Sequence, residues 1–387
     1  MFTSDFIING QGVGDVGERF HNQYRFEPRL LRPFVGRDGK AYVTVKTGRQ
    51  LVDNKTGKSK PEYRTVTVND ARHHGFDIPM DVTNATSLRK DEWIKFDEAV
   101  VMATRQRLRA WTDLASANSY GGFDGMSKTI LEHETQSDPG EAMVDMHGTT
   151  EGRNDAPLYK LEGMPLPITH ADFFIKHRTL MQSRNMGSPL DTTTAEAAGR
   201  RVAEQIEKSV IGTVTPYAYG VSTAYSQTSK VYGYTTHPAR NTKTDVTTPT
   251  GVSTNATTVS EVLGMIKTLN DDGFYGPFMM YHSTDWAPFM DADYSANKGD
   301  NTLRDRLKKI DSISDVRQLD FLTSTFTLIL VQMTADVARA INGMDITTLR
   351  WETRGGMQIN YKVMAIQVPQ IRDDYNNNCG IMHATTA

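Results

Sequence analysis

The feature that most constrains this chain is the segment 123–166, which is long, polar and acidic and is predicted to be a loop. Loops of this length are rare in compact domains unless they are functional or reach out to a partner. Residues 1–35 are a second such region, because their four glycines and scattered arginines show no helical or strand period. We therefore expect the packed core elsewhere in the 387 residues and two outlying segments that need external support.

The outlying regions carry opposite charge, although the formal net charge of the chain is only −3. From Arg19 to Arg72 there are 13 lysine and arginine residues against 5 aspartate and glutamate residues. From Met126 to Asp172 the counts are 3 against 9. Segments of opposite sign predict complementary surfaces, which meet either within one subunit or between neighbouring copies. Solvated loops of chance composition are the alternative.

A β-hairpin is predicted after the N-terminal arm. Asp38-Gly39 is a turn signal, and the strands are Lys40–Thr47 and Glu62–Asn69, joined by the Lys- and Gly-rich connector Asp53–Pro61. Neither face of the second strand is strongly apolar, so we expect the hairpin to lie outside the core. An isolated two-stranded ribbon is marginal in water, and a neighbouring subunit would support it.

Two helices are well signalled. The first begins near Asp91 and is predicted to end before the Asn118–Gly122 cluster, with this inward stripe: Ile94, Phe96, Val100, Val101, Leu108 and Trp111. The second begins at the capping box Thr193–Glu196 and ends at Gly212. Its inward face is Ala195, Ala198, Val202, Ile206 and Val210. The small residues Ala197 and Gly199 would allow another backbone to approach closely.

The C-terminal half alternates helices and strands. Residues 214–256 are predicted to form irregular strands and loops, and the capping box Thr258–Glu261 is predicted to open a helix. The later expected elements are the strand Pro277–Tyr281, a short charged helix over Thr302–Ile310, the strand Phe326–Gln332, and a hairpin of Thr347–Thr353 and Met357–Val368 around Arg354-Gly355-Gly356.

The sequence offers one candidate cofactor motif, and its context fails. Residues Gly12–Gly17 match G-x-G-x-x-G, in which glycines let a backbone approach a pyrophosphate at a helix N-terminus. No amphipathic helix follows, and the acidic residue about 20 positions on is missing. There is no G-x-S-x-G or Walker-type motif either. We interpret the glycines as part of a flexible arm and expect no cofactor.

No residues complete a catalytic or metal-binding constellation. The histidines His73, His74, His170 and His177 have no His-Glu-x-x-His or carboxylate spacing around them. The single cysteine, Cys379, excludes a disulfide framework and fits a reducing cytoplasm. No run approaches the roughly 18 consecutive apolar residues of a membrane span, and the N-terminus lacks a secretory signal. We expect no enzyme activity and no metal site.

The basic arm leaves two interpretations open. Its arginines and the aromatic residues Phe20, Tyr24 and Phe26 would suit nucleic acid, through phosphate attraction and base stacking. The arm could instead lie across neighbouring subunits, with its aromatic side chains in grooves and its arginines paired with acidic loops. We favour the second interpretation because the hairpin needs a supporting surface.

A series of short sequence segments occurs in the same order along the chain as in a known family. In order, they are the Trp93 helix, Pro165–Ile168, Asp172-Phe173-Phe174, Ala197-Ala198, Arg200–Ala203, Gly212, Asn342–Ile346 and Gln367–Pro369. This order is similar to that of encapsulin (linocin-type) shell proteins, which are relatives of tailed-phage major capsid proteins with the Hong Kong 97-type fold. The resemblance covers roughly residues 85–385.

The resemblance implies an α+β fold of the Hong Kong 97 type. The implied parts are an arm with a β-hairpin (1–90), the N-terminal helix of a peripheral domain (91–125), an extended E-loop (126–166), the peripheral domain (167–256) with a spine helix at 191–213, an axial domain (257–335), and a C-terminal return to the peripheral domain (336–387). Two departures stand out. About 90 residues precede the Trp93 helix, and Ile206-Glu207 stands where encapsulins tend to carry an acidic pair.

The resemblance implies a major capsid protein of a tailed phage. Such a protein assembles through hexamers and pentamers into an icosahedral head around double-stranded DNA, with portal, scaffold or decoration proteins as further partners. An encapsulin-type nanocompartment around cargo enzymes is the alternative, and a soluble nucleic-acid-binding protein is the third reading. We expect inter-subunit contacts at Arg37, Lys40, Lys55, Lys58, Lys60, Glu132, Glu134, Asp138 and Glu141.

Overall fold

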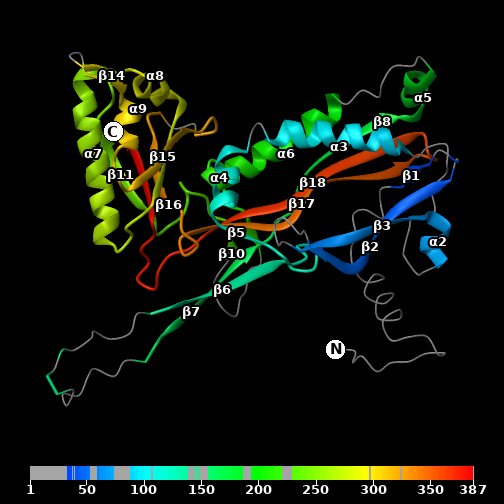
Figure 1. The fold of residues 1–387 in the computed structure, drawn as a ribbon, viewed down its shortest axis with the longest axis horizontal. Coiled ribbons are helices and arrows are strands. Elements are labelled where there is room, and N and C mark those ends of the chain that lie inside the picture. The colour runs from blue at the N-terminus through cyan, green and yellow to red at the C-terminus, as the bar shows by residue number, and fades with distance from the viewer. Residues whose placement is uncertain are drawn as a thin grey trace. The chain divides into compact units, whose positions relative to one another are not determined.

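The computed structural model describes two compact units (Figure 1). The described residues are 33–36, 38, 40–52, 59–73, 88–105, 108–137, 144, 146–147, 156–185, 193–219, 229–295, 298–322 and 325–386. The first unit comprises Met1–Arg107, Ile168–Ala203 and Met344–Ala365. The second comprises Leu108–Pro167, Glu204–Gly343 and Ile366–Ala387.

The N-terminal hairpin of the first unit belongs to a four-stranded sheet of order β3-β2-β1-β4. The strands are β1 (Phe34–Val35), β2 (Ala41–Val52), β3 (Ser59–Thr67) and β4 (Leu88–Arg89). A helix that was not predicted, α2 (Val68–His73), follows β3 directly. Val43 and Val45 of β2 are buried together with Val68 and Ala71 of α2. The expectation of a hairpin without a core was therefore wrong, because α2 covers one face of β2.

Two helices of the first unit pack at a glycine. They are α3 (Lys90–Arg105) and the N-terminal part of α6 (Thr193–Ile211). A Cβ atom on Gly199 would lie 3.1 Å from the carbonyl oxygen of Val100. The close approach predicted at Gly199 is confirmed, whereas Ala197 is exposed. The predicted inward residues of α6, including Val202, are buried.

The single helix predicted from Asp91 is two helices. α3 ends at Arg105, and α4 (Arg109–Ala117) begins after Leu108, while residues 106–107 lie outside the described part. The predicted inward position of Ile94, near the start of α3, was wrong, because this residue is 48% exposed. Val100 is buried as predicted.

A second four-stranded sheet has the order β5-β17-β18-β8. It comprises β5 (Ser119–Tyr120), β8 (Thr169–Lys176), β17 (Ala338–Thr353) and β18 (Gln358–Ile371). β17 and β18 form the predicted hairpin and contribute residues to both units. In the first unit β8 pairs antiparallel with β18, and Phe173 stacks on Tyr361 with ring centroids 5.1 Å apart. The helix α5 (His177–Asn185) follows β8.

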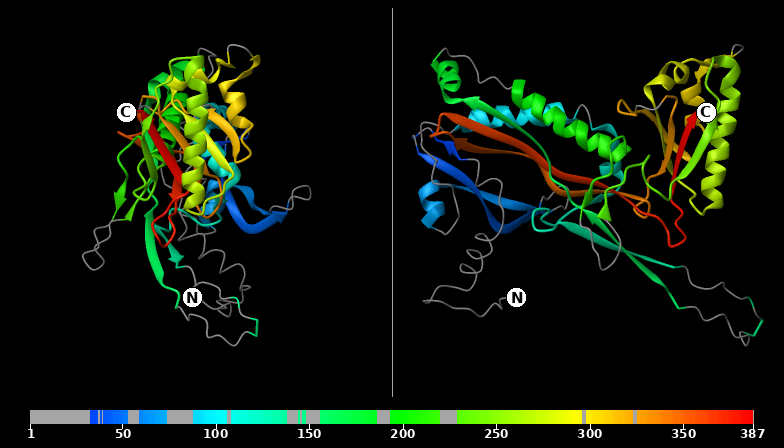
Figure 2. Two further views of the ribbon diagram at one scale, coloured as in Figure 1. Left: turned by 90° about the vertical axis from the view of Figure 1, so that its left-hand side faces the viewer. Right: turned by 180° about the vertical axis from the view of Figure 1, so that it is seen from behind.

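The core of the second unit is a five-stranded mixed sheet of order β11-β19-β16-β12-β15 (Figure 2). Its strands are β11 (Asn241–Val246), β12 (Phe278–His282), β15 (Ile313–Gln318), β16 (Leu328–Gln332) and β19 (Ile381–Thr386). Both predicted strands, β12 and β16, are confirmed. The buried cluster joins this sheet to the long helix α7 (Val252–Asp271) and to α9 (Leu303–Lys308).

The helix α7 begins six residues before the predicted capping box. Its N-cap is Gly251, which has a φ of 139° and so turns the chain into the helix. Thr258 is fully buried, and its hydroxyl donates to the carbonyl oxygen of Thr254 within the helix. The prediction that Thr258 caps the helix was therefore wrong. The shorter elements of this unit are β9 (Ala218–Tyr219), β10 (Ser229–Lys230), η2 (Thr284–Trp286), α8 (Ala287–Met290), β13 (Asp293–Ser295) and β14 (Lys298–Thr302).

A two-stranded ribbon reaches out from the second unit (Figure 1). It consists of β6 (Ile130–Gln136) and β7 (Tyr159–Pro165), which pair antiparallel from Ile130↔Pro165 to Gln136↔Tyr159. The backbone N–H of Ser137 donates to Leu158 at 2.8 Å and extends the pairing. The acidic segment predicted as a loop thus contains a ribbon at its base.

Candidate functional site

The ribbon presents two different faces, because side chains alternate along each strand. Exposed residues on β6 are Glu132, Glu134 and Gln136, and exposed residues on β7 are Tyr159 and Leu161. The register places them on one face, with Glu134 opposite Leu161 and Gln136 opposite Tyr159. We call this face the outer face. The alternate residues, such as His133 and Lys160, form the inner face.

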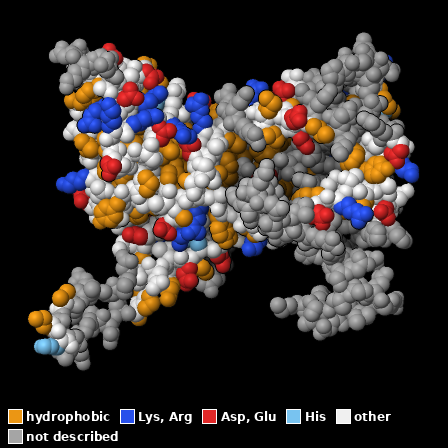
Figure 3. Space-filling model, in the orientation of Figure 1, with side chains coloured by type: hydrophobic (Ala, Val, Ile, Leu, Met, Phe, Trp, Pro, Cys, Tyr) orange, Lys and Arg blue, Asp and Glu red, His pale blue; other side chains and the backbone are white. Residues whose placement is uncertain are grey.

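The outer face carries both acidic and apolar side chains. Tyr159 and Leu161 on this face are 58% and 59% exposed. Farther along the same excursion, Val144 and Met146 are 102% and 93% exposed. Figure 3 shows hydrophobic side chains near the base and at the outer end of this projection, at the lower left. Single exposed apolar residues are ordinary, so the paired strands matter most here, because the register places Tyr159 and Leu161 on the same face.

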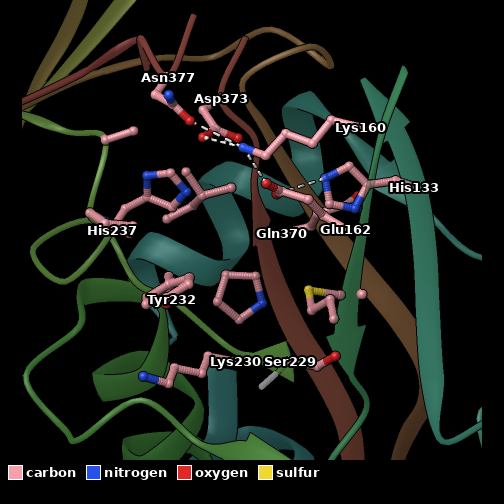
Figure 4. Close-up of a pocket in the computed structure, with 16 residues that line it drawn as sticks. His133, Lys160, Glu162, Ser229, Lys230, Tyr232, His237, Gln370, Asp373 and Asn377 are labelled. Atoms are coloured by element: carbon pink, nitrogen blue, oxygen red, sulfur yellow. Dashed lines mark hydrogen bonds and ion pairs between the residues drawn. The ribbon is translucent and has the colours of Figure 1, made fainter. Parts of the chain in front are cut away.

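Ion pairs and a hydrogen bond of Lys160 anchor the inner face of the ribbon. The Lys160 Nζ lies 2.6 Å from Glu162 Oε1 and 3.6 Å from Asp373 Oδ2, and it donates to Asn377 Oδ1 at 3.1 Å (Figure 4). Burial alone would lower the pKa of Lys160, but the hydrogen bond to Glu162 and the charge of Asp373 raise it above its usual value. Lys160 is therefore a cation that ties the ribbon to the C-terminal segment.

Two further contacts hold the ribbon base. Arg372 donates from Nη2 to the carbonyl oxygen of Glu134 at 3.2 Å. His133 Nε2 lies 3.7 Å from Glu162 Oε2, and within the described structure neither ring nitrogen of His133 has a hydrogen-bond partner. Burial, assisted by the nearby Arg372, lowers the pKa of His133. Its imidazole is therefore neutral at neutral pH.

A pocket of about 640 Å³ lies beside this anchor (Figure 4). Its walls include Lys160 and Glu162 from β7, Ser229 and Lys230 from β10, and the loop residue His237. His237 is 3% exposed, and burial lowers its pKa. A protonated lysine held by carboxylates is a poor nucleophile, and a neutral buried imidazole has no serine or cysteine partner at hydrogen-bond distance in the described chain. The arrangement is suited to holding segments together.

Metal binding finds no support in the described residues. Among them, no group of three or more His, Cys, Asp or Glu side chains is placed to hold a metal ion. Cys379 is buried, and burial raises the pKa of its thiol to about 12. A thiol with so high a pKa carries almost no thiolate at neutral pH. His170 is exposed and lies 3.2 Å from Asp172.

The structure places four of the nine predicted contact residues. Glu132 and Glu134 lie together on the outer face of the ribbon in the second unit. Lys40 is exposed in the first unit, and Lys60 lies on β3 opposite Leu51. The others, Arg37, Lys55, Lys58, Asp138 and Glu141, lie outside the described residues, as does the glycine motif 12–17.

The sequence analysis did not predict the apolar residues of the outer face. Tyr159 and Leu161 alternate with Lys160 and Glu162 over four residues, a pattern typical of a strand with one apolar face. The acidic composition of the whole segment concealed this short alternation. In the part of the chain that the structure describes, no helix is long and apolar enough to cross a membrane.

Comparison with known proteins gives one curated relative. The type 1 encapsulin shell protein EncA of Myxococcus xanthus (strain DK1622) is 26% identical over 198 residues. The match covers 49% of this chain and 59% of EncA, so the chain spans less than two thirds of that relative's length.

Two solved structures share the arrangement of elements. The virus-like particle of Pyrococcus furiosus matches with a TM-score of 0.50 and 13% identity, covering 76% of this chain and 98% of that chain. The capsid of Myoviridae phage XM1 matches with a TM-score of 0.52 and 9% identity, covering 71% of this chain and 92% of that chain. These likenesses confirm the predicted α+β fold of the Hong Kong 97 type with an encapsulin-like core.

The family match extends over most of the chain. Residues 83–384 match DUF6260, which is described as a family of unknown function. The relatives found by sequence and by structure are, by name, a shell protein, a virus-like particle and a phage capsid. The chain belongs to the DUF6260 family and has a shell-forming capsid fold.

Proposed function

We propose that this protein is the major capsid protein of a tailed phage. It assembles through hexamers and pentamers into an icosahedral head that encloses double-stranded DNA. The observation that carries the proposal is a capsid fold whose ribbon exposes Tyr159 and Leu161 beside Glu132 and Glu134. An apolar and acidic surface on a narrow projection gains most by packing on another subunit.

In this proposal the ribbon is the base of the E-loop and α6 is the spine helix. The outer face packs on a second copy of the chain, and its acidic residues meet the basic region Arg19–Arg72 of that copy. A single exposed ion pair contributes only about 0–1 kcal/mol. The stability of the shell would come from repeating this weak contact between many copies around a closed shell.

An encapsulin-type nanocompartment is the second candidate. The sequence likeness to EncA favours it. The roughly 90 residues before the Trp93 helix favour the phage shell, because a long arm and hairpin can lace neighbouring subunits together. The contents of purified shells distinguish the two, since one encloses nuclease-resistant DNA and the other encloses a cargo enzyme. Neighbouring genes for terminase and portal would support the first candidate.

The proposal is tested by negative-stain microscopy of the purified chain. The wild-type protein should form closed shells, and the double variant Tyr159→Asp, Leu161→Asp should remain as unassembled subunits. Leu263→Asp is the matched control, because Leu263 is a 46% exposed leucine on α7, away from the ribbon. Shells of normal yield from the double variant would overturn the role given to the outer face.

A further inference from the structure

One face of the second four-stranded sheet exposes aromatic side chains. In the first unit the strands β17, β18 and β8 lie side by side, and their side chains alternate between two faces. On one face Tyr361 and Val363 are fully buried. On the other face Trp351 of β17 and Phe174 of β8 are 40% and 54% exposed. The solvated face of an antiparallel sheet is ordinarily polar, so two exposed rings there call for an explanation.

Contacts across the three strands place both rings on one surface. The Nζ of Lys362 on β18 lies 5.9 Å from the centroid of the Trp351 ring and 3.5 Å from Asp172 Oδ2 on β8. Phe174 is two residues beyond Asp172 and therefore on the same face of β8, opposite Asn360 of β18. We call the surface formed by Trp351, Lys362, Asn360, Asp172 and Phe174 the aromatic face.

The polar residues of the aromatic face are paired with one another. A lysine over an indole ring is attracted by the π electrons of the ring, so Lys362 helps to fix Trp351. Asp172 balances the charge of Lys362, and Asn360 donates to the Thr353 hydroxyl at 2.8 Å. A surface whose side chains are already ordered loses little entropy on binding. Aromatic residues are also enriched in protein interfaces, so the aromatic face has the character of a docking surface.

The outer face of the ribbon matches the aromatic face in size. Tyr159 and Leu161 are two residues apart on β7, which separates their Cα atoms by about 7 Å. Trp351 and Phe174 lie on strands with β18 between them, which places those strands about 10 Å apart. Both surfaces are β-structure with two apolar side chains a short distance apart. Packing one on the other would remove four apolar side chains from water.

The charges of the two surfaces are opposite. The outer face carries Glu132 and Glu134. Lys176, which is in phase with Asp172 along β8, is exposed at the edge of the aromatic face. Lys362 is 30% exposed there. Two cations against the single carboxylate of Asp172 leave the aromatic face with net positive charge, which complements the acidic outer face.

We propose that the aromatic face receives the outer face of the ribbon from a second copy of this chain. The inference rests on the proposed function, because it names the surface on which the ribbon packs. Tyr159 and Leu161 lie against Trp351 and Phe174 of the second copy. The basic region Arg19–Arg72 belongs to the same unit as the aromatic face. One neighbouring unit therefore offers both an apolar and a basic surface to the ribbon.

Cysteine cross-linking of the full chain tests this contact directly. A chain with Leu161→Cys and Phe174→Cys is treated after assembly with a short bismaleimide and run on a denaturing gel. The native Cys379 is buried and should not react. A ladder of covalent dimers and larger oligomers is expected. The matched control is Leu263→Cys with Phe174→Cys, because Leu263 is an exposed leucine on α7, and this chain should remain monomeric on the gel.

A second variant covers the case in which the cysteines themselves weaken the contact. Phe174→Asp should strongly reduce the yield of shells in light scattering. Because Phe174 is 54% exposed, the denaturant midpoint of the unassembled subunit should stay close to that of the wild type. Tyr275→Asp is the control, since Tyr275 is an aromatic residue of the second unit that is 74% exposed. It should assemble like the wild type.

Electron microscopy of the cross-linked sample separates this inference from the proposed function. Closed shells without a ladder, or with cross-links only within single chains, overturn the inference and leave the capsid assignment intact. A ladder from open oligomers without shells supports the contact and contradicts the proposed function. A ladder that disappears after nuclease treatment would show that nucleic acid bridges the copies, and it would overturn the inference. Normal shell yield from Phe174→Asp would overturn it as well, and a chain that stays monomeric would contradict both.

Discussion

The β6–β7 ribbon and the five-stranded sheet lie in the same unit, yet different forces hold them. The sheet buries apolar side chains such as Leu330 and Phe278 against α7 and α9. The ribbon has two strands, a polar inner face held by Lys160 and an outer face that exposes Leu161. A two-stranded ribbon is marginal in water. The sheet is therefore stabilised by its own core, whereas the ribbon is held by polar contacts on one face and, under the proposed function, is completed by a partner on the other.

The largest loss of stability is expected from a cavity in the sheet. Leu330 lies on the central strand β16 and is 1% exposed. Leu330→Ala should lower the free energy of unfolding by about 2–5 kcal/mol, because it removes buried methyl groups and leaves a cavity. Denaturant unfolding measures this loss. If Leu330→Ala lowered the free energy of unfolding no more than Leu161→Ala does, the sheet would not be more strongly stabilised by its core than the ribbon.

A smaller loss is expected where the ribbon joins the sheet of β17. A Cβ atom on Gly125 would lie 2.8 Å from the Cα of Gly343, and the Gly125 N–H donates to the Gly343 carbonyl oxygen at 3.1 Å. Gly125→Ala should destabilise the protein by about 1–3 kcal/mol, since backbone must move to make room. Gly122→Ala is an imperfect control, because its φ of 94° adds backbone strain. Gly264→Ala on α7, with open space around it, is the better one and should be neutral or stabilising.

The ion pairs of Lys160, which hold the ribbon, should contribute less to the free energy of unfolding. Lys160 is 29% exposed, so Lys160→Met should cost only about 0–1 kcal/mol of global stability. It should nevertheless speed amide exchange in 130–136 and 159–165. The raised pKa of Lys160 means that its contribution is complete at neutral pH and is lost only as the pH rises through that raised value. Unchanged exchange in both strands would show that the anchor is dispensable.

The smallest effect on folding is expected from the outer face. Leu161→Asp changes a 59% exposed side chain, so the unfolding free energy of the isolated subunit should stay within about 0.5 kcal/mol of the wild type. The same change should strongly reduce the yield of shells. Calorimetry of unassembled protein and light scattering of assembly reactions separate the two effects. A variant that unfolds easily would instead place Leu161 in the fold of its own subunit.

Local patterns predicted the elements that depend on local chemistry. Gly212, with a φ of 92°, ends α6 where predicted, and the strands β12 and β16 lie where runs of apolar residues indicated. The inner face of α6 was also correct. These features are encoded by capping, glycine geometry and short apolar runs, which a sequence shows directly.

Features that depend on contacts distant in sequence were not predictable. The break between α3 and α4, the small core under α2 and the capping of α4 by Glu207 all require the partner segment to be in place. Glu207 and Ala110 are 97 residues apart, so no local pattern links them. At the candidate site, composition indicated the acidic residues Glu132 and Glu134 but concealed the apolar residues beside them.

The most direct test of the central claim is the assembly state of the purified full-length chain at high concentration. Light scattering combined with electron microscopy should find closed, icosahedrally symmetric particles, and Tyr159→Asp, Leu161→Asp should shift the population to free subunits of unchanged stability. A wild-type protein that stays monomeric at every concentration, with the ribbon packed on its own chain, would contradict the account.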